Sequence, residues 1–392
     1  MTSADGQWFC SHSLPWSKCK EFLPSELAAL QHFLQSLRTS SLPTPGEFQG
    51  RGIVMSGGPG HVLQALANLR VLRTVHKSMM PVEFWHAFEL GEEHCAALRS
   101  RGARCRALRI PGVYALYQTV LPAIMLSDFR HVLWMDTDVT PLVRPESLFQ
   151  STAYRKTGAL FWPDLWGAGC SKFGQTAWSH HVAWHALNLS YDETDLHCTV
   201  EHEAGHLLID KEMHWRPLCL ANYLSSRDFF ARVMHGYKDV FRLAWLKMSS
   251  SNWFSSVRPG LIGSVSSDGS FIPTALVHFW PSGDEFGSGE DGRDVAVYVH
   301  QKKFPGRTWA EIVTFTTSLH ECSHLVASDR PNHQDTHEAT FHDVDSRFAE
   351  LWSLARLHPE LLKKLKFVED QWELGWRQGK VAVRNGSAHE KK

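Results

Sequence analysis

Residues 131–139 read HVLWMDTDV, an apolar run that ends in two carboxylates one residue apart, Asp136 and Asp138. The run predicts a buried strand. Because side chains i and i+2 of a strand point to the same face, both carboxylates are expected on one side of the strand end. Two hard oxygen ligands there suit Mg²⁺ or Mn²⁺, which would in turn hold a diphosphate. Two solvated aspartates in a turn before Pro141 explain the motif equally well, so its surroundings must decide.

The chain before this stretch predicts alternating strands and helices. Residues 52–56 form a short apolar strand that runs into a glycine-rich turn and a helix. Two more strand and helix pairs follow, with strands at 81–87 and 103–110 and helices at 91–100 and 114–127. This alternation predicts an α/β fold with a mostly parallel, doubly wound central sheet flanked by helices. Ligands of such sheets bind beyond the C-terminal ends of the strands, where the two aspartates fall.

The chain after Pro141 is less regular. Strands are expected at 159–164 and 205–210, and each ends in a carboxylate, Asp164 or Asp210. A late strand is expected at 295–299 and is followed directly by His300. We expect a leader segment at 1–50, a catalytic domain at 51–305, a helical extension at 306–378 and a disordered tail at 379–392.

Composition narrows the class of protein. The chain has 392 residues, of which 43% are hydrophobic and 21% charged, so it has ample length for a large globular core. A net charge of -1 gives no reason to expect a nucleic-acid partner. We find no apolar run long enough for a transmembrane helix and no signal peptide. Eight cysteines do not make a disulfide scaffold. Cys95 with Cys105, and Cys198 with Cys219, are equally explained as disulfides or as reduced thiols.

Several separated blocks of this sequence resemble glycosyltransferase family 71, the Golgi α-mannosyltransferases of fungal glycan elongation. Together they span roughly residues 52–300 in a matching order. The blocks are Ala65–Arg73, Pro81–Glu83, Leu126–Phe129, Trp134–Asp138, Pro145–Phe149, Thr157–Asp164, Glu201–Gly205, Ile209–Lys211, His214–Trp215, Lys238–Asp239 and Phe241–Ala244. The chain also departs from the family pattern, which has a lysine near Tyr117, Gln118 and Val120, an aspartate where Tyr237 stands and a serine where Ala204 stands.

The resemblance implies a GT-A-like, Rossmann-related nucleotide-sugar transferase fold. It implies Mn²⁺ or another divalent cation, GDP-mannose as donor, a glycan or glycoprotein acceptor and retention at the transferred sugar. It also implies a Golgi location, with association with the Golgi membrane or with other transferases, although the family's membrane anchor is not visible in this sequence. Carried over by position, the metal ligands are Asp136, Asp138 and His300. Lys303 would neutralise the leaving diphosphate. Lys211 is a candidate contact of the donor, although a solvated surface lysine is the more ordinary interpretation.

Glycosyl transfer also needs groups that orient the acceptor and stabilise charge at the anomeric centre. The candidate catalytic carboxylates are Glu203, Asp164, Asp210 and Asp239. Glu203 comes first because it lies beside Gly205, where the backbone could approach a sugar.

Two other functions remain open at this point. Residues 202–206 match the zinc-peptidase motif H-E-x-x-H, as do residues 320–324. The first match runs into the apolar segment 207–209, which reads better as a strand than as the helix that the motif needs. The departures at Val120 and Tyr237 suggest instead a non-catalytic relative that binds glycans or scaffolds other transferases. The retained Asp136, Asp138 and His300 argue against that interpretation.

Overall fold

A computed structural model gives the structure of the chain. It describes residues 23–40, 47–108, 116–168, 183–189, 199–227, 230, 237–257, 259–265, 271–281 and 296–301. Lys303, the second H-E-x-x-H match and the predicted C-terminal segments lie outside these residues.

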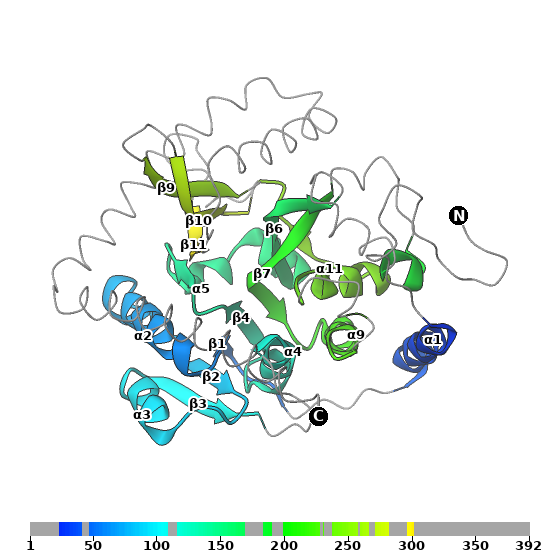
Figure 1. Cartoon of the computed structure of the whole chain (residues 1–392), viewed down its shortest axis with the longest axis horizontal. Coiled ribbons are helices and arrows are strands. Elements are labelled where there is room, and N and C mark those ends of the chain that lie inside the picture. Colours follow the sequence, from blue (N-terminus) through cyan, green and yellow to red (C-terminus); the bar gives the residue numbers. More distant parts are fainter. Residues whose placement is uncertain are drawn as a thin grey trace, which may run out of the picture.

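The described part of the chain is built on a seven-stranded sheet with the order β3-β2-β1-β4-β7-β6-β8 (Figure 1). The strands are β1 (Arg51–Ser56), β2 (Val82–His86), β3 (Ala103–Ala107), β4 (His131–Met135), β6 (Ala159–Ala168), β7 (Thr199–Asp210) and β8 (Trp253–Phe254). The first four are parallel to one another, as is the pair β6 and β8. This confirms the predicted α/β class with a mostly parallel sheet flanked by helices. β7 runs antiparallel to both of its neighbours, β4 and β6, which the sequence did not indicate.

Helices cover both faces of this sheet because both faces are apolar. The four buried residues 132–135 of β4 alternate between the two cores, with Val132 and Trp134 in one and Leu133 and Met135 in the other. One core is closed by α1 (Pro24–Thr39), α4 (Leu116–Leu126), α9 (Trp215–Ser225) and α11 (Lys238–Lys247). The other is closed by α2 (Val62–Arg70), α3 (Glu92–Ser100) and the short helices α5 (Pro145–Leu148) and α6 (Thr152–Thr157). Figure 1 shows α2 and α3 on one side of the sheet and α4, α9 and α11 on the other.

A second, four-stranded antiparallel sheet lies at the C-terminal edge of the parallel strands. Its order is β5-β11-β10-β9, with β5 (Val139–Pro141), β11 (Ala296–Gln301), β10 (Phe271–Phe279) and β9 (Gly260–Val265). β5 follows Asp138 directly, so the chain passes from one sheet to the other at the acidic motif. The sequence missed β5 because a three-residue strand that ends in proline reads as a turn.

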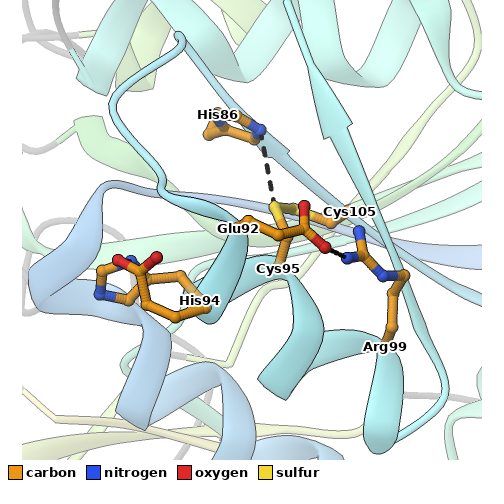
Figure 2. The surroundings of a disulfide bond; sticks show 7 residues. His86, Glu92, His94, Cys95, Arg99 and Cys105 are labelled. Atoms are coloured by element: carbon orange, nitrogen blue, oxygen red, sulfur yellow. Dashed lines mark hydrogen bonds and ion pairs between the residues drawn. A yellow bond between two sulfur atoms is a disulfide. The ribbon is translucent and has the colours of Figure 1, made fainter.

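The cysteines give a partial answer to the question left open above. Cys95 on α3 and Cys105 on β3 form a disulfide (Figure 2). Cys219 carries a free thiol, and Cys198 lies outside the described residues. Within the part of the chain that the structure describes, no helix has both the length and the apolar character needed to cross a membrane.

Candidate metal and diphosphate site

The acidic motif lies where β4 ends, on the ligand-binding edge of the parallel strands. The Asp136 amide donates to the Gly205 carbonyl of β7 at 2.7 Å, and the Val139 amide donates to the Asp136 carbonyl at 3.1 Å. These two bonds make a tight turn that carries Asp136 and Asp138. The two carboxylates therefore project from a fixed backbone and not from a mobile loop end.

Asn68 on α2 also holds this turn. Its side-chain amide donates to the carbonyls of Thr137 at 2.9 Å and Val139 at 2.8 Å, and its oxygen accepts from the Thr140 hydroxyl at 3.1 Å. Asn68 is buried, so these bonds are shielded from water. Sequence analysis placed Asn68 in a family-like block without giving it a role. The sequence carries no signal for this role, because the partners of Asn68 lie about 70 positions further along the chain.

His300 reaches the two aspartates from the second sheet. It pairs with Val139 across the β5 and β11 ladder, and ligand atoms of Asp136, Asp138 and His300 lie within 4.8 Å of one another. Its Nε2 lies 3.4 Å from Asp138 Oδ1. Two carboxylate oxygens and one imidazole nitrogen form a donor set that suits Mn²⁺, so the residues present fit a divalent cation. Sequence analysis picked the same three residues.

The electrostatics of this cluster also fit a cation. Burial, and then the charge of Asp138, raise the pKa of Asp136 to about 8. Burial alone would lower the pKa of His300, but the charges of Glu203 and Asp138 raise it well above its usual value. The charge of Asp138 contributes to both pKa shifts, and that of Glu203 to the shift of His300, so negative charge is concentrated in a largely buried place. A bound cation would supply the positive charge that the cluster lacks.

Glu203 lies behind His300. Its side chain is 1% exposed, with Oε2 3.2 Å from His300 Nδ1 and Oε1 accepting from the Gly205 amide at 2.8 Å. Gly205 is required here because a Cβ at this position would lie 2.8 Å from His300 Cε1. The space beside Gly205 is therefore taken by His300. This corrects the expectation that the glycine lets a sugar approach the backbone. The neighbouring Ala204 is fully buried in the core that α1, α4, α9 and α11 close, and it faces away from the site.

A second charged pair lies close to Glu203. Asp164 on β6 is fully buried and forms an ion pair with Lys238 at the start of α11. Burial would lower the pKa of Lys238, but Asp164 and then Glu203 raise it above its usual value. Lys238 belonged to a family-like block, and sequence analysis gave a role only to its neighbour Asp239. Asp239 accepts from the His202 backbone amide at 3.1 Å and so anchors α11 to β7.

Tyr237, one of the departures from the family pattern, touches the acidic motif directly. Its hydroxyl lies 3.2 Å from each carboxylate oxygen of Asp136. The hydroxyl therefore orients this carboxylate from the side of α11. No sequence signal beyond the departure itself pointed to this contact.

Asp210 and Lys211 lie at the other edge of the sheet. Asp210 pairs with His131 at the start of β4, roughly 13 Å along the strand from Met135. Its carboxylate binds Arg130, and Lys211 Nζ donates to the Ser127 carbonyl at 2.7 Å. The placement corrects both predictions, because an antiparallel strand carries its C-terminal end away from the ligand-binding edge. Neither residue belongs to the candidate site.

The zinc-peptidase geometry is also absent here. His202, Glu203 and His206 belong to β7, where four residues of extended strand separate the backbones of the two histidines by about 13 Å. On a helix the same two histidines would be one turn apart and could share one zinc ion. His202 Nδ1 lies 2.8 Å from the Lys238 carbonyl, and His206 is fully buried against Trp162 and Tyr298. These histidines therefore pack inside the fold.

A family model described as "Mannosyltransferase putative" matches residues 50–280 of the chain. The Alpha-1,2-mannosyltransferase MNN21 of Candida albicans is 33% identical over 132 residues, which cover 27% of this chain and 20% of the relative. The Alpha-1,2-mannosyltransferase MNN2 of Saccharomyces cerevisiae is 28% identical over 165 residues, or 38% and 27% of the two chains. The chain thus spans about a quarter of the length of these curated relatives. Among solved structures, the mannosyltransferase Ktr4p from S. cerevisiae matches 61% of this chain and 78% of its own at 12% identity, with a TM-score of 0.36. That score is too low to carry an argument.

Proposed function

The chain belongs to the putative mannosyltransferase family, and on this premise we propose that it is a metal-dependent, retaining α-mannosyltransferase. Its donor would be GDP-mannose and its acceptor a mannoside of a glycan or glycoprotein. The single observation that carries the proposal is the convergence of Asp136, Asp138 and His300 at the ligand-binding edge of the sheet. Three residues from two sheets, more than 160 positions apart at the extremes, meet there.

The donor end of the site is assigned as follows. Asp136, Asp138 and His300 would hold Mn²⁺ or a similar cation, which when bound offsets the charge of the leaving diphosphate. Glu203 positions His300, because a carboxylate 3.2 Å from Nδ1 favours the proton on that nitrogen and leaves Nε2 free for the cation. Tyr237 orients Asp136. Lys303, outside the described residues, is proposed to contact the leaving diphosphate.

The transfer itself exchanges one bond for another at the anomeric carbon of mannose. The bond from C1 to the phosphate oxygen of GDP breaks, and a bond from C1 to the acceptor oxygen forms on the same face. The acceptor proton passes to the leaving phosphate oxygen, so that the products are GDP and an α-mannoside. The charge of Glu203 acts on the buried pair of Asp164 and Lys238, and this pair is proposed to orient the acceptor hydroxyl.

Activity is tested by incubating the purified chain with Mn²⁺ and GDP-mannose, UDP-glucose or UDP-galactose. Nucleotide release is measured with and without a mannoside acceptor, and again after removal of the metal with a chelator. We expect release from GDP-mannose that rises with acceptor and disappears with the chelator. No release with any donor would overturn the proposal and would favour a non-catalytic relative.

We also propose that the chain works in the Golgi lumen, in association with the membrane or with other transferases. The family resemblance suggests this location, and a disulfide between Cys95 and Cys105 suits an oxidising compartment. Peptide mapping of the native protein under non-reducing conditions, with free thiols blocked at lysis, tests the compartment. Recovery of both cysteines as blocked thiols would contradict it.

A further inference from the structure

The loop that follows β2 presents an unusual aromatic residue at the ligand-binding edge. Phe88 is 60% exposed and has a φ of 73°, a backbone conformation that bulky residues rarely adopt. A phenylalanine that is mostly exposed to solvent adds little to the packing of the core. Strained and exposed residues of this kind concentrate where a protein contacts a ligand.

The next residue, Glu89, leans over the glycine-rich turn that follows β1. A Cβ placed on Gly58 would lie 3.3 Å from Glu89 Cγ and 3.5 Å from its Oε1. The absence of a side chain at Gly58 thus leaves room for this carboxylate. The imidazole of His61 is within electrostatic range of both Glu89 and Asp138. One histidine therefore lies within range of both this loop and the candidate metal site.

The spacing between the candidate metal site and the loop that carries Phe88 matches the length of a nucleoside diphosphate. β2, β1 and β4 are consecutive neighbours in the sheet. Asp136 and Asp138 follow the end of β4, and the loop with Phe88 follows the end of β2. Two strand spacings amount to about 10 Å. That is comparable to the reach of a nucleotide from its phosphates to the far edge of its base. A diphosphate held at Asp136 and Asp138 would therefore place its base near Phe88 and Glu89.

The loop is attached to a rigid base. The Leu108 amide donates to the His86 carbonyl at 2.8 Å, and the Gly57 amide donates to the Trp85 carbonyl at 3.1 Å. Below the loop, Cys95 Sγ of the disulfide lies 3.9 Å from His86 Nε2 (Figure 2). His86 is 7% exposed, and its Nδ1 has no hydrogen-bond partner among the described residues. A buried nitrogen of this kind is satisfied by a polar ligand or by water.

We propose that Phe88 and Glu89 form the base subsite of the donor and select guanine. Phe88 would stack on the base, and the Glu89 carboxylate would accept from N1–H and the 2-amino group. A carboxylate can only accept, and guanine offers two adjacent donors on its Watson–Crick edge. Uracil offers a single N–H that lies between two carbonyl oxygens. The negative carboxylate is repelled by these two oxygens, so uracil should bind less well. This inference rests on the function proposed above, because it assumes a nucleotide diphosphate at Asp136 and Asp138.

Calorimetric titration of the full chain with GDP, IDP and UDP, in Mn²⁺, tests the subsite. IDP differs from GDP only by lacking the 2-amino group. The unchanged chain should bind GDP about tenfold or more tightly than IDP, and UDP more weakly still. Glu89→Gln should reduce the preference for GDP over IDP to about twofold or less. Phe88→Ala should weaken GDP and IDP alike by about tenfold, because stacking is indifferent to the base edge.

Glu93→Gln is the matched control, since Glu93 is an exposed carboxylate on the neighbouring helix α3 and should leave all three affinities unchanged. The preference is a ratio within one variant, so partial misfolding cannot imitate its loss. An unaltered ratio in Glu89→Gln would overturn the base subsite while leaving metal-dependent nucleotide binding, and the proposed function, in place. If the unchanged chain binds none of the three nucleotides in Mn²⁺, the proposed function fails and the subsite fails with it.

Discussion

The two ends of β7 carry similar side chains and differ in what those side chains do. Near one end, Glu203 contacts His300 beside the candidate metal site, and the ion pair of Asp164 and Lys238 lies close by. At the other end, Asp210 and Lys211 bind Arg130 and the end of α4. Both ends belong to blocks that resemble the same family, so a family-like block is not sufficient to place a residue in the site. The direction of the strand decides which end reaches the ligand.

The largest effect should follow from breaking the site end. Asp138→Ala removes a proposed metal ligand whose side chain is 37% exposed, so the fold should tolerate the change. We expect kcat/KM for mannosyl transfer to fall at least about 1000-fold, or about 4 kcal/mol, because the charge of the diphosphate is no longer offset. The matched variant at the other end, Asp210→Asn, should keep the activity of each folded molecule. Steady-state kinetics with thermal melting decides this. Loss of turnover in well-folded Asp210→Asn would contradict the assignment of one end of β7 to the site and of the other end to the fold alone.

At the structural end, Lys211→Met should mainly lower stability. Lys211 is fully buried and donates to the Ser127 carbonyl, the Ser127 hydroxyl and the Met125 carbonyl, at 2.7, 3.1 and 3.2 Å. Removing the ammonium leaves buried acceptors without donors, which should reduce the free energy of unfolding by about 2–3 kcal/mol. Urea titration measures this, with exposed Lys156→Met on α6 as the control. If the two variants are equally stable and Lys211→Met no longer binds GDP-mannose, Lys211 belongs to the candidate site after all.

A smaller effect is expected from Gly205→Ala, which crowds the site without removing a ligand. The new Cβ would lie 2.8 Å from His300 Cε1 and 3.0 Å from Nδ1, so His300 must shift. We expect the affinity for Mn²⁺ to fall about tenfold, since small displacements of a ligand weaken metal binding. Ala204→Gly, on the opposite face of the same strand, should cost stability of about 1 kcal/mol and leave Mn²⁺ affinity unchanged. Metal titration of both variants separates these outcomes, and the same Mn²⁺ affinity in both would show that Gly205 is not needed for His300.

The sequence predicted the parallel half of the fold and the position of Asp136 and Asp138 at a strand end because both depend on local signals. Apolar runs bounded by glycine and proline mark the strands, and Asp136 and Asp138 follow such a run at once. The order of the family-like blocks added His300, which local patterns alone would not connect to residue 138. Both predictions need only that strands end where their apolar runs end.

What the sequence could not give depends on pairing between distant segments. Nothing in residues 199–210 says that β7 runs antiparallel, so Asp210 and Lys211 were placed at the wrong edge of the sheet. Asn68, Lys238 and Tyr237 were missed because their roles come from partners about 70 to 100 positions away. An uncharged side chain or an isolated lysine has no chemical signature until such a partner is known.

The smallest expected effect concerns the pH dependence of the Asp210 pair. Burial would raise the pKa of Asp210, but its hydrogen bonds to Arg130 lower it below the usual value. The pair therefore stabilises the fold above the unfolded pKa of about 4, and this contribution is lost as pH falls through the folded value. Because Arg130 is 40% exposed, the whole contribution should be about 1 kcal/mol. We expect the gap in unfolding free energy between the unchanged chain and Asp210→Asn to be constant above about pH 5 and to narrow below about pH 4. Urea titrations at each pH, with the exposed Glu93→Gln as control, measure it. A gap that stays constant down to pH 3 would mean that Asp210 holds this edge of the sheet by packing and not by charge, which would weaken the contrast between the two ends of β7.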